Sequence, residues 1–195
     1  MLKLTSYIYF PFILGLASIA NNLIPFLLGE QWKPSVIYFQ LLCIAGLLYP
    51  IHSINLNILK VKNRSDLFLF LEIVKKTTLT ILIVFAILLD YGVIGLILAA
   101  IANSFISLFI NTYYSSKEIN YSFFQQIKDM LPSFVITIFM FLVVYKLDSI
   151  IQINILVDLF AQITIGVVLY LGLSWILRLD EFNIIKSLLK SLKAR

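Results

Sequence analysis

Six apolar runs dominate this sequence, and all but the fifth, which is short, are close to the length that a lipid bilayer demands. They are continuous rather than alternating, and short polar breaks such as GEQWKP and DYG separate them. A helix needs roughly 17–25 mostly apolar residues to cross a bilayer, whereas a β-barrel would show alternation. We therefore predict an all-α, polytopic transmembrane helix bundle of about six spans, at residues 7–28, 35–59, 67–89, 93–114, 132–145 and 155–177.

Composition agrees with this fold class. Only 13% of the residues are charged and 61% are hydrophobic, against about 25% charged residues in a soluble domain. The single cysteine, Cys43, lies within a span and cannot form an internal disulfide, so we interpret it as a small buried apolar residue.

The spans group into three parts. Residues 1–131 hold four spans and a polar, amphipathic connector, SSKEINYSFFQQIKDM, residues 132–177 hold two further spans, and residues 178–195 form a basic tail. The tail is predicted to be an amphipathic helix on the membrane surface. Its apolar positions are Phe182, Ile185, Leu188, Leu189 and Leu192, with Lys186, Lys190 and Lys193 on other faces.

The basic residues fix an expected orientation. With six spans, all but Lys33 and Lys146 of the 15 lysines and arginines fall on one side of the membrane. Because cations concentrate in cytoplasmic loops, both termini are expected in the cytoplasm. The net charge of +5 is then a consequence of topology, and we expect no nucleic-acid partner.

A polar stripe follows the second span. At about 100° per residue, one helical face carries Tyr49, Ser53, Asn57, Lys60 and Arg64, with His52 at its edge and Asn55 off it. Pro50 is expected to kink the helix. The stripe is either the wall of a cavity that holds an anionic head group or a helix end with ordinary topology-marking cations. His52 is more often a hydrogen-bonded packing residue than a proton carrier.

The third span contains charges. Glu72 is followed at i+3 and i+4 by Lys75 and Lys76, so the carboxylate can reach either ammonium, and Thr80 extends the same edge. Charges inside a bilayer cost several kcal/mol. These residues therefore either line a wet cavity, which we favour, or belong to an interfacial lead-in whose lysines extend to the membrane surface.

Other polar residues give less specific signals. Asn21 and Asn22, deep in the first span, either form helix–helix hydrogen bonds or line a substrate path, while Asn103 lies in a small-residue patch, AAIANS, suited to helix packing. We find no metal-ligand spacing, phosphate-binding loop or nucleophile motif. The sequence therefore predicts no catalytic residues, no cofactor and no metal site, and we do not expect an enzyme.

Three segments resemble a known family. FPFILGLASIANNLIPFLLGEQW, LLCIAGLLYPIHSINLNILKVKNRSDLFLFLEIVKK and DYGVIGLILAAIANSFISLFINTYYSSK are similar to the later spans of bacterial polysaccharide flippases, the exporters of lipopolysaccharide, O-antigen and exopolysaccharide within the multidrug/oligosaccharidyl-lipid/polysaccharide exporter superfamily. The resemblance covers residues 10–131 well and the last two spans loosely.

The resemblance implies a function and a partner. It implies the C-terminal part of a two-lobed transporter in the bacterial inner membrane that moves an undecaprenyl-pyrophosphate-linked oligosaccharide between leaflets by alternating access. An N-terminal lobe, in the same longer chain or in a separate subunit, is the implied partner, beside membrane lipid. The cavity residues carried over are His52, Asn57, Lys60, Arg64, Glu72, Lys75 and Lys76. The alternatives are a cation-coupled multidrug exporter of the same superfamily and a non-transporting fragment or scaffold.

Overall fold

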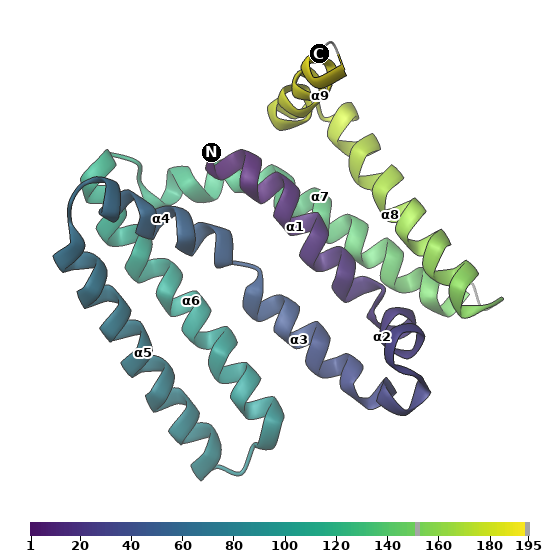
Figure 1. Cartoon of the computed structure of the whole chain (residues 1–195), viewed down its shortest axis with the longest axis horizontal. Coiled ribbons are helices and arrows are strands. Elements are labelled where there is room, and N and C mark those ends of the chain that lie inside the picture. Colours follow the sequence, from purple (N-terminus) through teal and green to yellow (C-terminus); the bar gives the residue numbers. More distant parts are fainter. Residues whose placement is uncertain (151–152, 194–195) are drawn as a thin grey trace. The chain divides into compact units, whose positions relative to one another are not determined.

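The chain consists almost entirely of helices joined by short turns in its described part, residues 1–150 and 153–193 of a computed structural model, with side chains described as far as Ser187 (Figure 1). No strand occurs among these residues, so the predicted all-α class is confirmed. The elements are α1 (Leu2–Ser18), α2 (Ala20–Leu28), the 3₁₀ helix η1 (Glu30–Ser35), α3 (Val36–Gly46), α4 (Tyr49–Val61), α5 (Ser65–Leu88), α6 (Gly92–Ile119), α7 (Phe123–Ile150), α8 (Ile155–Ile176) and α9 (Asp180–Lys193).

Within the described residues, fewer segments qualify as apolar spans than the six that were predicted. By length and composition, Glu30–Val61, α6, α7 and α8 could each cross a membrane, and α1 with α2 makes a fifth if that bent pair counts as one span. The predicted third span does form a helix, α5, of 24 residues. It does not qualify because Glu72, Lys75 and Lys76 lie near its middle.

The first two predicted spans are broken rather than continuous. The axes of α1 and α2 differ by 71°, and the two helices meet beside Ser18, whose hydroxyl donates to the Gly15 carbonyl at 2.7 Å. In the second span α3 ends at Gly46 and α4 begins at Tyr49. Pro50 has no N–H to donate to the Gly46 carbonyl, so a break replaces the expected kink.

The helix boundaries around the predicted connector, and those of the short fifth span, also differ from the prediction. Residues 115–119 continue α6, and α7 begins at Phe123, well before Pro132. Ser122 and Gln125 form a reciprocal capping box: the Ser122 N–H donates to Gln125 Oε1 at 2.8 Å and the Gln125 N–H to Ser122 Oγ at 3.3 Å. Asn120, with φ 52°, ends α6 in the left-handed conformation that asparagine tolerates.

The turn between α6 and α7 is closed by a phenol–carboxylate contact. Tyr121 Oη donates to Asp129 Oδ2 at 2.5 Å. Burial, and then this hydrogen bond, raise the pKa of Tyr121. The neutral phenol is therefore the favoured form in the folded turn. Its contribution to the free energy of unfolding is retained until the pH is well into the alkaline range.

The chain forms two compact units. The first consists of residues 3–36 and 130–195 with Met1, and the second of residues 37–129 with Leu2. The first unit thus holds α1, α2, η1, α8, α9 and most of α7. The second unit holds α4, α5, α6, nearly all of α3 and the first turns of α7. The organisation into residues 1–131, 132–177 and 178–195 divides the chain by topology and stays a prediction.

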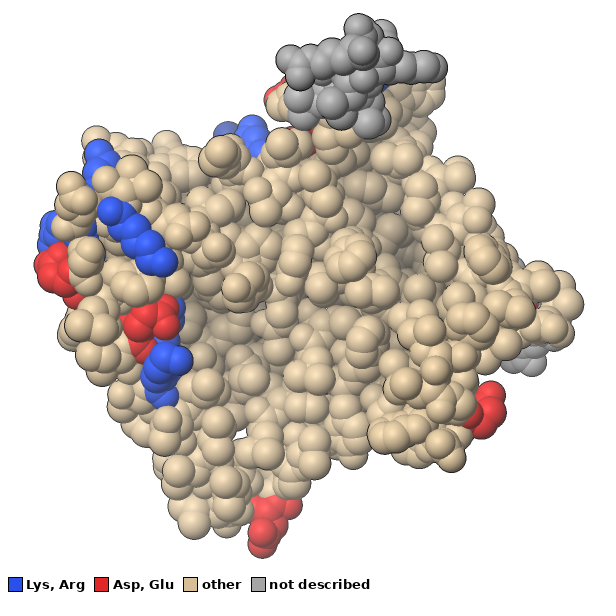
Figure 2. All heavy atoms as spheres, viewed as in Figure 1, with Lys and Arg blue, Asp and Glu red and all other residues tan. Residues whose placement is uncertain are grey.

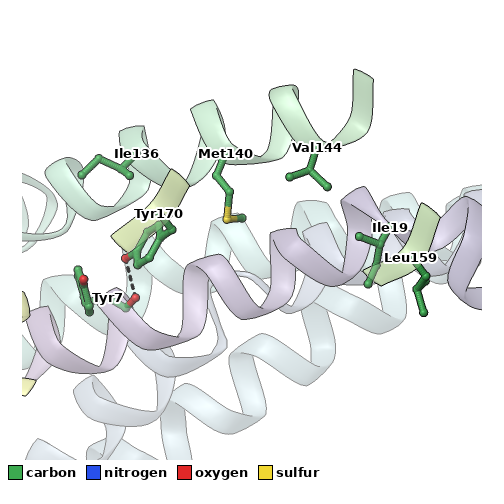
Figure 3. Packing of buried hydrophobic residues seen from close by; sticks show 7 residues of the cluster. All are labelled: Tyr7, Ile19, Ile136, Met140, Val144, Leu159 and Tyr170. Carbon is green, nitrogen blue, oxygen red and sulfur yellow. Dashed lines mark hydrogen bonds between the residues drawn. The ribbon is translucent and has the colours of Figure 1, made fainter. Parts of the chain in front are cut away.

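In the first unit, α1, α7 and α8 pack around one apolar cluster (Figure 3). Its buried members are Tyr7, Ile19, Ile136, Met140, Val144, Leu159 and Tyr170. The Tyr170 hydroxyl donates to the Tyr7 carbonyl at 2.6 Å, which ties α8 to α1.

The predicted tail helix is present as α9, and part of its apolar face is covered by protein. Phe182 and Ile185 pack against the cluster of the first unit as partly buried residues. The side chains of Leu188, Leu189, Leu192, Lys190 and Lys193 lie outside the described part of the chain. Lys186 is exposed, as the amphipathic pattern predicts.

Close approach of α8 to α7 gives a first testable prediction. A Cβ on Gly166 would lie 3.2 Å from Val144 Cγ2, whereas one on Gly172, in the same helix, would meet nothing within 4 Å. We expect Gly166→Leu to lower the free energy of unfolding by about 1–3 kcal/mol through overpacking, with little change for Gly172→Leu. Thermal unfolding in detergent measures both, and equal effects of the two substitutions would contradict the packing.

Candidate functional site

The second unit contains a polar cavity between α4, α5 and α6. Its volume is about 540 Å³, and α6 packs against both α4 and α5. In Figure 2 the charged side chains of this unit gather over α4 and the first half of α5, at the left of the view. Within the described part of the chain, no group of three or more His, Cys, Asp and Glu side chains could hold a metal ion.

Most of the candidate residues meet in this cavity. Those that line it are His52, Asn57, Lys60, Glu72, Lys75 and Lys76. The polar stripe on α4 and the charges on α5, which the sequence analysis interpreted separately, therefore belong to one site. Their role in binding a substrate stays a prediction.

On α4, the face of the helix on which a polar residue lies decides whether that residue lines the cavity. Asn57 and Lys60 are exposed toward the cavity, whereas Asn55, placed off the stripe, is only 1% exposed. Asn55 Nδ2 donates to Thr112 Oγ1 and to Gln126 Oε1, both at 3.1 Å, and the Ser115 hydroxyl donates to Asn55 Oδ1 at 2.8 Å. These contacts hold α4 against α6 and the start of α7, with the stripe facing the cavity.

The α5 wall carries one of the two ion pairs that the i+3 and i+4 spacings allow. Lys75 Nζ contacts Glu72 Oε1, and their side chains are 12% and 29% exposed. Lys60, across from α5, places its ammonium 4.4 Å from the centroid of the Phe68 ring, a cation–π contact. Thr80, one turn beyond Lys76, does not line the cavity, and its hydroxyl donates to the Lys76 carbonyl of its own helix.

The α6 wall fixes His52. One ring nitrogen, Nε2, lies 3.2 Å from Ser104 Oγ and the other, Nδ1, lies 3.4 Å from Asn111 Nδ2. If the Asn111 amide donates to Nδ1, the Nε2 proton faces Ser104. Both ring nitrogens have protein partners, so the geometry favours the packing role over a proton carrier.

Sequence reasoning missed three residues of the α6 wall, namely Asn103, Ser104 and Ser107. The small-residue patch around Asn103 indicated helix packing, yet Asn103 lines the cavity and its buried Oδ1 has no hydrogen-bond partner in the described structure. An unpaired amide oxygen can accept a hydrogen bond from a ligand hydroxyl. The available signal was the polar pair within an apolar run, together with Ser107 one turn beyond.

Arg64 does not line the cavity, contrary to its assignment as a cavity residue. Its guanidinium pairs with Glu118 Oε1 at 2.8 Å and with Asp66 Oδ1 at 3.3 Å. The hydrogen bond from Arg64 holds the pKa of Asp66 below its usual range. The stripe continues as far as Arg64 in sequence, but α4 ends at Val61 and the chain reverses through Asn63, with φ 56°.

Asn21 and Asn22 are also outside the cavity and take the other role considered for them. They belong to the first unit, where Asn21 Nδ2 donates to Asp148 Oδ2 and Asn22 Nδ2 to Asp148 Oδ1, both at 2.8 Å. Gln162 joins them, with its Nε2 3.3 Å from Asp148 Oδ1. One carboxylate on α7 thus receives amide donors from α2 and α8, a helix–helix contact that the sequence did not reveal.

Comparisons with known proteins agree with the resemblance drawn from the sequence. The family model described as "Polysaccharide biosynthesis protein" matches residues 1–37. The chain is also 32% identical, over 117 residues, to the lipopolysaccharide biosynthesis protein WzxC of Escherichia coli strain K12. The resemblance to the polysaccharide flippase family is confirmed.

The extent of this similarity is limited. The match with WzxC covers 56% of this chain and 23% of WzxC, so the chain spans less than a quarter of that relative's length. No solved structure matches the chain. What the chain shares with these proteins is thus a stretch of sequence within a multi-helix, apolar chain.

Proposed function

We propose that the chain is the C-terminal portion of a transporter that moves an undecaprenyl-pyrophosphate-linked oligosaccharide across the bacterial inner membrane by alternating access. The observation that carries this proposal is the cavity of the second unit, where three lysines face a space of about 540 Å³ in a helical chain that is 61% hydrophobic. Charges at such a position are costly unless they serve an anion or a wet path.

The cavity chemistry fits both parts of such a substrate. A pyrophosphate entering a membrane needs charge compensation, which Lys60, Lys75 and Lys76 supply. Sugar hydroxyls need donors and acceptors, which Asn57 and the unpaired Asn103 Oδ1 supply. The cationic balance of the cavity makes it a poor site for cationic drugs, so the polysaccharide substrate is favoured over the multidrug alternative.

The proposal includes a partner and an orientation. Alternating access requires two bundles that move against each other around a site near the membrane midplane. A first lobe, in the same longer chain or in a separate subunit, is accordingly part of the proposal, as are cytoplasmic termini. The role is transport and not catalysis.

Translocation in a defined membrane tests the proposal. The polypeptide that contains residues 1–195, with any separate subunit that supplies the first lobe, is reconstituted in liposomes with a fluorescent undecaprenyl-pyrophosphate-linked oligosaccharide. We expect the label to become accessible to an impermeant quencher faster than in protein-free liposomes. The same oligosaccharide on uncharged undecaprenol is expected to move more slowly. No acceleration for either lipid would reject the proposed function.

A further inference from the structure

The cavity of the second unit holds one carboxylate among its cations. Its lining residues include three lysines, Lys60, Lys75 and Lys76, and a single acidic side chain, that of Glu72. The cavity therefore has an excess of two positive charges when His52 is neutral. Glu72 is the one lining group that repels the anion that the proposed function requires.

The three lysines are engaged to different degrees. Lys75, the least exposed, is paired with Glu72. Among the described residues, the Lys60 ammonium has only the weaker contact with the Phe68 ring, and the Lys76 ammonium has no ion pair or hydrogen bond. An incoming anion can reach Lys60 and Lys76 at once, but it can reach Lys75 only by replacing the Glu72 carboxylate.

From this geometry we propose that Glu72 is an internal counter-anion that competes with the diphosphate group of the transported lipid for Lys75. The inference rests on the proposed function and names a residue that sets how tightly its cavity holds the substrate. Without substrate, the Glu72–Lys75 pair spares a poorly solvated ammonium the cost of having no partner. With substrate, the displaced carboxylate stays one turn away on α5 and repels the bound diphosphate.

Such competition suits a transporter. A site that holds its cargo too tightly cannot release it on the other side, so binding must be favourable enough for entry and weak enough for exit. The i+3 spacing keeps Glu72 beside Lys75 throughout, because both side chains lie on one helical face. A neutral ligand gains nothing from displacing the carboxylate, so the pair also discriminates against uncharged lipids.

Binding of a short diphosphate lipid tests this role. Farnesyl diphosphate is titrated into the detergent-solubilised polypeptide that contains this chain, with farnesol as the uncharged comparator. We expect Glu72→Gln to tighten farnesyl diphosphate binding about fivefold to tenfold, as removal of a like charge at short range should, and to leave farnesol binding unchanged. Glu118→Gln is the matched control, because Glu118 pairs with Arg64 outside the cavity.

If Glu72 competes for Lys75, the effect of replacing Glu72 must depend on Lys75, and a protein that lacks Lys75 tests this. In a Lys75→Ala protein, Glu72→Gln is expected to change farnesyl diphosphate affinity less than twofold. Glu72→Ala serves as an independent variant with the same expected direction, should Glu72→Gln fold poorly. A thermal unfolding curve for each variant separates loss of fold from loss of competition.

The outcomes separate this inference from the proposed function. If the wild type binds farnesyl diphosphate and Glu72→Gln binds it equally or more weakly, the counter-anion role is overturned and the proposed function stands. If Glu72→Gln tightens binding equally with and without Lys75, Glu72 acts through the general field of the cavity and the competition is also overturned. If neither the wild type nor the Glu72 variants bind farnesyl diphosphate better than farnesol, the diphosphate site itself fails.

Discussion

Replacing Lys75 and Lys76 together with alanine is expected to slow translocation of the lipid-linked oligosaccharide by about 100-fold or more. Both side chains line the cavity of the second unit, and a hydrogen bond to a charged group contributes roughly 1.5–3 kcal/mol, or about tenfold or more for each lysine. The loss arises because the diphosphate would enter a cavity left with Lys60 alone as its cation while Glu72 keeps its negative charge.

Two control proteins make this result specific. Lys75→Arg with Lys76→Arg keeps both charges and is expected to retain most of the translocation rate, which separates charge from side-chain shape and from membrane orientation. Lys62→Ala removes a cation next to the end of α4 that does not line the cavity, and is expected to have little effect. Normal translocation by the double alanine protein in the liposome assay would show that these lysines mark topology only.

The α4 and α5 sides of the cavity were largely predictable from the sequence. Helical periodicity put Asn57 and Lys60 on one face and Asn55 on another, and the i+3 and i+4 spacings put both Lys75 and Lys76 within reach of Glu72. These are local relations along one helix, so they do not depend on the tertiary packing. That the two helices face the same space depends on how α4 and α5 pack, which the sequence only indicated.

The misplaced candidates failed for non-local reasons. Arg64 follows the helical pattern of α4, but α4 ends before Arg64, whose guanidinium pairs with Glu118 of α6. Asn21 and Asn22 are 126 or more residues away from Asp148 along the chain, so no periodicity could reveal their partner. Asn103 was missed for the opposite reason: a small-residue patch permits both close packing and a cavity wall.

The helix boundaries illustrate a further limit. Continuous apolar composition predicted unbroken spans, because hydropathy does not detect a backbone break. The break before Tyr49 had a signal in Pro50, and the early start of α7 had one in the Ser122–Gln125 capping box. Both signals are local, and capping chemistry would have corrected the connector where hydropathy alone could not.

Asn55→Leu is expected to lower the free energy of unfolding by about 2–4 kcal/mol, the range of a disrupted buried polar network. Leucine has a similar size but can neither accept the hydrogen bond of Ser115 nor donate to Gln126. Thr112, Ser115 and Gln126 are each at most 1% exposed, so water cannot replace the lost partner. The expected loss exceeds that of a single surface hydrogen bond because three contacts disappear together.

Asn57→Leu is the matched control for this prediction, since it makes the same substitution two residues away on the exposed side of α4. Unfolding by SDS titration in mixed micelles measures both proteins, and Asn57→Leu is expected to shift the free energy of unfolding by less than about 0.5 kcal/mol. Equal losses would mean that α4 is held by its apolar contacts and not by Asn55. A selective loss at Asn55 would show that the polar groups of α4 have two separate tasks: one face fixes the helix, and the opposite face is left available for the cavity.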